Sequence, residues 1–124
     1  MENRDLCEKL FAAFSSGDAD GVRQLCTADL KASQNGGAPM NLDTLLHFTM
    51  AVLGVVKDFR YEDAIRSTTE TGFVEEHNVR GTLPDGSKME LAVCVVGDVE
   101  GGKISRLREY VDSAAAAGLI AALS

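Results

Sequence analysis

The sequence predicts an α+β domain in which N-terminal helices pack across the concave face of a curved, cone-like antiparallel sheet. In the first half of the chain apolar residues recur with the 3.6-residue period of a helix, whereas from Phe59 onward they alternate with polar residues as in strands. The strand-like segments are joined by short, glycine-containing turns that suit antiparallel hairpins. Helices followed by a strand meander are typical of the α+β class.

Two helices are predicted at the N-terminus, the first over residues 3–15 and the second directly after Asp18. One side of the first helix carries apolar residues four positions apart, namely Leu6, Leu10 and Phe14. The carboxylate of Asp18 can accept hydrogen bonds from the first turn of the second helix. The apolar side of that second helix is expected to hold Val22, Leu25 and Cys26.

A polar, glycine-rich stretch from Asp29 to Met40 follows, in which neither a helix nor a strand is predicted. Asn41 can then cap a third helix over about 42–56. This helix is apolar over much of its circumference, so we expect other elements to cover it on more than one side.

Four strands are predicted in the second half of the chain, over Phe59–Thr69, Phe73–Leu83, Lys88–Asp98 and Lys103–Val111. Asp112-Ser113 can cap a final short helix over Ala114–Leu123. A strongly bent sheet with helices across its mouth can enclose a pocket instead of a solid core.

Length and charge limit the function classes. The 124 residues suit one domain, over residues 1–124. The formal net charge of −7 is repelled by phosphate groups, so neither nucleic acid nor a membrane is an expected partner. The three cysteines form no C-x-x-C pair, and the first residues lack the apolar run of a signal peptide. We therefore expect a cytoplasmic protein with reduced thiols.

The segment from Gly102 to Asp112, GKISRLREYVD, resembles the last-strand signature of SnoaL-like proteins in the nuclear transport factor 2 / ketosteroid-isomerase-like superfamily. The segment Ser15 to Asp18 and the Gln34-Asn35 pair also fit, and Gly86 and Gly102 bracket a strand of the length found in limonene-epoxide-hydrolase relatives. The resemblance spans nearly the whole chain and implies the cone-like fold and a homodimer. The superfamily includes isomerases, cyclases, hydrolases and non-catalytic binding proteins, so the resemblance leaves the reaction open.

The resemblance also implies roles for individual residues. In the epoxide-hydrolase relatives an Asp of the last strand activates water, and Glu109 stands at the matching place. The Asn that helps to hold that water is matched by Asn35, and a Tyr two residues before it is replaced by Ser33. Their Arg-x-Asp pair falls on either Glu76-His77-Asn78 or Asn78-Val79-Arg80, and neither register reproduces it. Epoxide hydrolysis is therefore disfavoured.

Strand alternation supplies a candidate site around Glu109. Leu107 and Val111 flank it on the same strand face, and a carboxylate among apolar walls has a raised pKa that suits a general base near neutral pH. On the second strand one face carries Glu76, Asn78 and Arg80. If that face lines the pocket, Arg80 is the counter-charge, Asn78 and Asn35 are hydrogen-bonding partners, and Glu76 is a second carboxylate that shares a proton with Glu109.

The other face of that strand carries Phe73, Glu75, His77 and Val79 and is expected on the outside, where a second copy of the chain can cover it. The predicted pocket lining consists of Leu91, Val93, Leu107, Val111, His47 and Met50. No metal-ligand spacing, phosphate loop or nucleotide fingerprint is present, so neither a metal nor another cofactor is expected.

Two functions remain open from the sequence. The first is a pocket for a small hydrophobic or polycyclic molecule, with isomerase, cyclase or hydrolase chemistry by Glu109. The second is a non-catalytic ligand-binding or dimerisation module, in which Glu109 forms a surface ion pair with Arg106 or Arg108. A continuous cavity that reaches Glu109 would favour the first.

Overall fold

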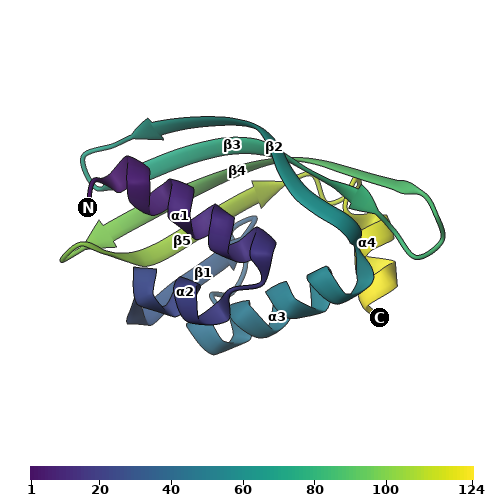
Figure 1. Cartoon of the computed structure of the whole chain (residues 1–124), viewed down its shortest axis with the longest axis horizontal. Coiled ribbons are helices and arrows are strands. Elements are labelled where there is room, and N and C mark those ends of the chain that lie inside the picture. The colour runs from purple at the N-terminus through teal and green to yellow at the C-terminus, as the bar shows by residue number, and fades with distance from the viewer.

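The computed structural model describes all 124 residues and has four helices around one curved, five-stranded sheet (Figure 1). The elements in chain order are α1 (Asn3–Ser16), α2 (Ala19–Leu25), β1 (Cys26–Gln34), α3 (Leu42–Val55), β2 (Lys57–Thr68), β3 (Gly72–Thr82), β4 (Lys88–Glu100), β5 (Lys103–Val111) and α4 (Ala117–Leu123). The strand order is β1-β5-β4-β3-β2, antiparallel except for the parallel pair of β1 and β5. The predicted α+β class is confirmed, although the sheet is mixed and has one strand more than the predicted meander.

The first three helices begin and end where local chemistry predicts. One face of α1 is buried against the sheet, and Gly17 ends the helix in the left-handed region at φ 71°. Asp18 and Asn41 cap α2 and α3 through side-chain oxygens that accept from the backbone N–H groups of Gly21 and Thr44, both at 2.9 Å. Figure 1 shows α1 crossing in front of the sheet and α3 running along its lower side.

The stretch from Asp29 to Met40 differs from its prediction. Its first part belongs to β1, the edge strand that pairs with β5. The pairing register shifts between Cys26 and Lys31, which breaks the two-residue alternation by which strands are recognised. A parallel strand also has no adjoining hairpin turn to mark it. The prediction that Cys26 lies in the second helix is therefore wrong, because this residue begins β1.

The end of the chain forms a shorter helix than predicted. The Asp112 carboxylate accepts from the backbone N–H of Ala114 at 2.9 Å, but this bond closes a turn, and α4 begins only at Ala117. Figure 1 places α4 at the right-hand end of α3, beside the open end of the curved sheet. No helix of the chain is long and apolar enough to cross a membrane.

The concave face of the sheet is filled at one end by the ring of Phe73, which has no exposed surface. It lies directly on Gly97 of β4, where an added Cβ would come within 2.3 Å of a ring carbon. Only a residue without a side chain fits there, because the ring is fully buried and fills the space that a Cβ would need.

We expect Gly97→Ala to destabilise the protein by about 1–3 kcal/mol, the usual cost of overpacking a filled core. Gly54→Ala is the matched control, because an added Cβ at this exposed position in α3 meets nothing within 4 Å. Alanine favours helix over glycine, so the control should gain up to about 1 kcal/mol. Urea denaturation followed by circular dichroism measures both. Equal stability of the two variants would contradict the close packing of Phe73 on Gly97.

Candidate functional site

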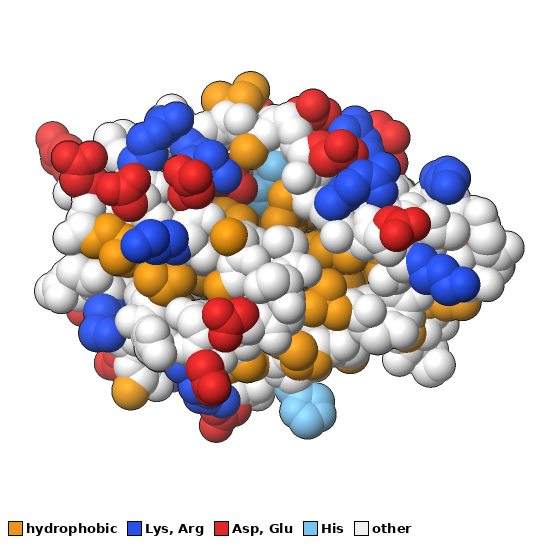
Figure 2. Space-filling model, viewed as in Figure 1, with side chains coloured by type: hydrophobic (Ala, Val, Ile, Leu, Met, Phe, Trp, Pro, Cys, Tyr) orange, Lys and Arg blue, Asp and Glu red, His pale blue; other side chains and the backbone are white.

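A cavity of about 240 Å³ lies between the concave face of the sheet and helices α1, α3 and α4. It is lined by 25 residues, of which 20 are hydrophobic. Figure 2 shows hydrophobic side chains exposed in a hollow near the centre of the face that is turned to the viewer. The lining is therefore mostly apolar, and its few polar groups decide which chemistry the cavity can support.

The strand β3 turns the opposite face to the cavity from the one predicted. Its inward residues are Phe73, Glu75, His77 and Val79, all of them buried. The prediction that Phe73, His77 and Val79 lie on the outside is therefore wrong. Phe73 and Val79 supply apolar area that the sheet buries against α1 and the cavity, and this burial stabilises the observed register over its alternative.

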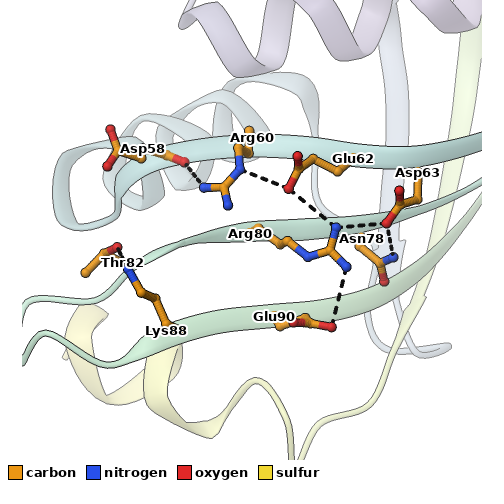
Figure 3. Close-up of polar contacts among 9 residues, drawn as sticks. All are labelled: Asp58, Arg60, Glu62, Asp63, Asn78, Arg80, Thr82, Lys88 and Glu90. Carbon is orange, nitrogen blue, oxygen red and sulfur yellow. Dashed lines mark hydrogen bonds and ion pairs between the residues drawn. The ribbon is translucent and has the colours of Figure 1, made fainter.

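Glu76, Asn78 and Arg80 consequently lie on the convex face, and the prediction that they line the pocket is wrong. Figure 3 shows Arg80 as the centre of a surface network. Its guanidinium lies 2.8 Å from Asp63, 3.4 Å from Glu62 and 3.5 Å from Glu90, and Asn78 donates to Asp63 at 3.0 Å. Hydrogen bonds from Arg80 lower the pKa of the Asp63 carboxyl. Arg80 and Asn78 are thus engaged in this surface network, and neither they nor Glu76 line the cavity.

Glu109 does line the cavity, together with its neighbours Leu107 and Val111. Burial raises the pKa of its carboxyl, while a hydrogen bond from Gln34 and the charge of His77 act in the opposite direction. The Gln34 side-chain amide donates to Oε1 of Glu109 at 3.4 Å. The cavity thus holds a partly buried carboxylate with one weakly bound amide partner.

Asn35 lies next to the site without lining the cavity. It adopts a left-handed φ of 51°, and its side chain donates to the carbonyl oxygen of Val111 at 3.0 Å and accepts from the same residue's N–H at 2.9 Å. It thereby fastens the end of β1 to the end of β5. Asn35 is placed to position the strand that carries Glu109, and its side chain does not contact the carboxylate.

The predicted apolar lining is partly found. Four of its residues line the cavity, namely Leu91, Val93, Leu107 and Val111. His47 and Met50 are exposed on α3 and do not line it. The helix presents Leu45, Phe48, Thr49, Val52 and Leu53 to the cavity instead. The near-uniform apolar character of α3 hides which side faces inward, so spacing alone could not exclude Met50.

The structure adds a triad that the sequence analysis did not identify, formed by the half-buried Arg66 with the buried Glu75 and His77. Nε of Arg66 lies 2.5 Å from Oε1 of Glu75 as an ion pair, without the alignment of a hydrogen bond. Nδ1 of His77 lies 2.5 Å from the other carboxylate oxygen. The Cys7 thiol also donates to Oε1 at 3.6 Å, and burial raises the pKa of this thiol to about 12, so it is neutral.

Strand pairing explains how the triad and Glu109 come together. One row of paired residues crosses all five strands, in the order Gln34, Glu109, Val95, Glu75 and Arg66. Paired residues on neighbouring strands point to the same face, and adjacent strands are about 4.8 Å apart. The backbones of Glu75 and Glu109 are therefore about 10 Å apart, and both side chains point to the concave face with one valine between them.

Aromatic rings enclose His77 within the cavity wall. Phe11 of α1 meets the imidazole edge-on with ring centroids 4.9 Å apart, and Tyr61 of β2 lies at 4.6 Å. Burial raises the pKa of the Tyr61 hydroxyl, and the charges of Glu109 and Glu75 raise it further. The signal that could have found this site was the buried-strand character of Phe73 and Val79, which places the residues between them on the inside.

Comparison with known proteins supports the fold. The family model described as a SnoaL-like domain matches residues 7–107. A proposed polyketide cyclase from Xanthomonas campestris superposes with a TM-score of 0.81 at 20% identity, covering 98% of this chain and 96% of its own. IdmH of Streptomyces antibioticus, also a proposed polyketide cyclase, gives 0.79 at 20% identity and 99% coverage of both chains.

A protein of ketosteroid isomerase-like fold from Catenulispora acidiphila, solved in complex with trimethylamine, gives a TM-score of 0.74 at 12% identity, with 86% of this chain and 84% of that chain covered. No curated protein matches the sequence significantly. At these identities the structural neighbours support the cone-like fold and do not assign a reaction.

We expect Glu75→Ala to cost about 3–5 kcal/mol, because it leaves the Arg66 charge and the buried His77 without their partner. Glu76→Ala is the matched control, since the adjacent residue lies on the convex face and should change stability by less than about 0.5 kcal/mol. Urea denaturation of the two variants compares them directly. A larger loss for Glu76→Ala would contradict the register of β3.

Proposed function

The chain belongs to the SnoaL-like domain family, and on this basis we propose that its cavity binds a small hydrophobic molecule and removes a proton from it with Glu109. The observation that carries the proposal is a carboxylate with a raised pKa inside an apolar cavity. Such a group is partly protonated closer to neutral pH than a surface carboxylate, so it can both take up and return a proton.

The chemistry that fits best is proton abstraction next to a carbonyl group. Both an isomerase and a cyclase can begin in this way, because the carbanion that forms is delocalised onto the carbonyl oxygen. The polyketide cyclase names of the structural neighbours agree with this class, as does the absence of the Arg-x-Asp pair of epoxide hydrolases from β3.

The size of the cavity supports a substrate of about two fused rings. Its volume of about 240 Å³ lies just below the range of roughly 300–1,000 Å³ in which drug-sized ligands are bound. Leu119, Ile120 and Leu123 of α4 also line the cavity, so a somewhat larger molecule requires movement of this short helix.

The alternative is a non-catalytic ligand-binding module of the same fold. One observation favours it, because Asn35, Glu76, Asn78 and Arg80, which the sequence suggested as helpers of Glu109, all point away from the cavity. Under this alternative a ligand would bind without any reaction, and removal of the Glu109 charge would strengthen the binding of apolar molecules.

Replacement of Glu109 by Gln tests the catalytic proposal with 2-tetralone, a bicyclic ketone that exchanges its activated protons for deuterium. We expect wild-type protein to accelerate this exchange in D₂O and the variant to lose about 100-fold or more of the acceleration, measured by proton NMR. The base must be ionised, so the wild-type rate should fall as pH decreases through the raised pKa of Glu109.

Glu76→Gln serves as the control, because it removes the same charge from the convex face of the sheet. It should exchange 2-tetralone at the wild-type rate. Full acceleration in Glu109→Gln would exclude this residue as the base. No acceleration by wild-type protein, together with naphthalene binding that is tighter in Glu109→Gln and unchanged in Glu76→Gln, would favour the non-catalytic alternative.

A homodimer through the convex face of the sheet remains part of our proposal. The face predicted for it is buried within the chain, but another row of paired residues lies on the outside, over Ile65, Glu76, Cys94 and Tyr110. Ile65 and Tyr110 at its ends are 63% and 45% exposed. An exposed apolar side chain at each end of this row favours a homodimer in which a second copy, related by a twofold axis, covers the row.

We expect sedimentation at micromolar concentration to give a species of twice the 13.2 kDa chain mass. Ile65→Glu should shift it to the monomer, because a charge would be buried in the interface. Ile120→Glu, which charges a similarly exposed isoleucine on α4, should leave it a dimer. A wild-type protein that sediments only as a monomer would rule out the dimer.

Two broader predictions complete the proposal. Residues 1–124 act as one SnoaL-like domain, and the protein works in the cytoplasm. The three cysteines support the second point, because all of them are free and two are buried.

A further inference from the structure

We propose that His77 is a second catalytic residue of the cavity, an imidazolium whose Nε2–H donates to the carbonyl oxygen of the substrate. Glu75 and Arg66 are positioning residues that hold its ring and its charge. This inference rests on the function proposed above and names the group that receives the negative charge when Glu109 removes the proton.

The orientation of the imidazole follows from its contacts. Nδ1 lies 2.5 Å from the Glu75 carboxylate, and His77 is also among the residues that line the cavity. The ring has two nitrogens, and the first is occupied by Glu75, so Nε2 is the one left for a ligand. The side chain is only 1% exposed, so bulk water does not compete for this nitrogen.

Both oxygens of the Glu75 carboxylate are engaged by groups of the chain itself, so Glu75 holds the imidazole in place and does not contact the substrate. Arg66 and Cys7 both contact Oε1, which leaves Oε2 for the imidazole. A buried carboxylate on Nδ1 sets the tautomer of a histidine and stabilises the imidazolium form, as in hydrolase triads. Arg66 forms an ion pair with Oε1 of Glu75, so its effect reaches the cavity through His77.

The other groups that face His77 are compatible with a positive charge. Phe11 of α1 and Val93 of β4 are apolar, and Tyr61 of β2 carries a neutral hydroxyl because burial raises its pKa. Glu109 of β5 interacts with His77 through space, and the charge of His77 lowers the pKa of its carboxyl.

The proton balance of the step is complete without a co-reactant. Glu109 takes a proton from the carbon next to the carbonyl, the electron pair of the broken C–H bond forms a C=C bond, and the carbonyl oxygen takes the Nε2 proton of His77. Glu109 then returns its proton to a carbon of the enol, while the enol O–H returns its proton to Nε2. Return of the proton to a different carbon gives an isomerisation. If the Glu109 carboxyl first exchanges its proton for a deuteron of the solvent, return to the same carbon gives deuterium exchange.

The first test compares His77→Gln with His47→Gln in the 2-tetralone assay. His47 is the other histidine of the chain and is exposed on α3. We expect His77→Gln to lower kcat for deuterium exchange by about 100-fold or more with a smaller change in KM, because the hydrogen bond strengthens as charge develops on oxygen. His47→Gln should match wild type.

The second test needs no catalysis. Nitrogen-15 NMR distinguishes protonated from unprotonated ring nitrogens, and with two histidines the His47→Gln variant assigns the signals. We expect both nitrogens of His77 to be protonated at pH 7, and 2-naphthol, an aromatic analogue of the enol of 2-tetralone, to shift the Nε2 signal more than Nδ1. In Glu75→Gln the doubly protonated signature should be lost while His47 stays unchanged.

The outcomes separate this inference from the function on which it rests. If Glu109→Gln loses the exchange but His77→Gln retains the wild-type rate, the inference fails and the proposed function stands. If His77→Gln loses exchange and Glu109→Gln does not, the assignment of the base fails instead. An unprotonated Nε2 in wild-type protein at pH 7, or a 2-naphthol shift confined to Nδ1, would overturn the inference irrespective of any folding defect in the variants.

Discussion

Glu75 has no exposed surface, and a carboxylate in that position is tolerated only while its charge is paired. Arg66 reaches it from the neighbouring strand, and His77 reaches it from two residues along β3, on the same concave side. A shift of β3 by one residue would send Glu75 and His77 to the outer face, away from Arg66 of β2, and bring Glu76 into the cavity. The pairing of Glu75 therefore ties the register of the sheet to the composition of the cavity.

At the opposite edge of the sheet, hydrogen bonds of Asn35 hold β1 against β5. Asn35 uses both functions of its amide on the backbone of Val111, and its own N–H donates to the carbonyl oxygen of Glu109 at 2.8 Å. These bonds join the ends of β1 and β5, two strands that are far apart in sequence. They also set Gln34 beside the Glu109 carboxylate, so the one amide that contacts this group owes its place to backbone hydrogen bonds.

Local chemistry made much of the fold predictable, because caps, glycine turns and hairpins act over a few residues. The helix starts after Asp18 and Asn41, and the four strands after Val56, follow from such signals. The parallel strand β1 does not follow from such signals. Its bulge hides the alternation of apolar and polar residues, and its partner strand β5 lies some 75 residues further along the chain. The prediction for the inner face of β3 is wrong because charged residues occur on both faces of this strand. Phe73 and Val79 are the apolar signal for the inner face, whereas the partner Arg66 that neutralises Glu75 is evident only in the tertiary structure.

The two carboxylates of the concave face differ in what remains available on them. Both oxygens of Glu75 are engaged, by Arg66 and Cys7 on one side and His77 on the other, so a substrate proton has no free site there. Glu109 has a single amide contact at 3.4 Å and lies in a mostly apolar cavity. The same residue type thus serves two purposes on one face. A fully paired carboxylate supplies a fixed charge that orients an imidazole, and a nearly unpaired one two strands away is free to exchange a proton.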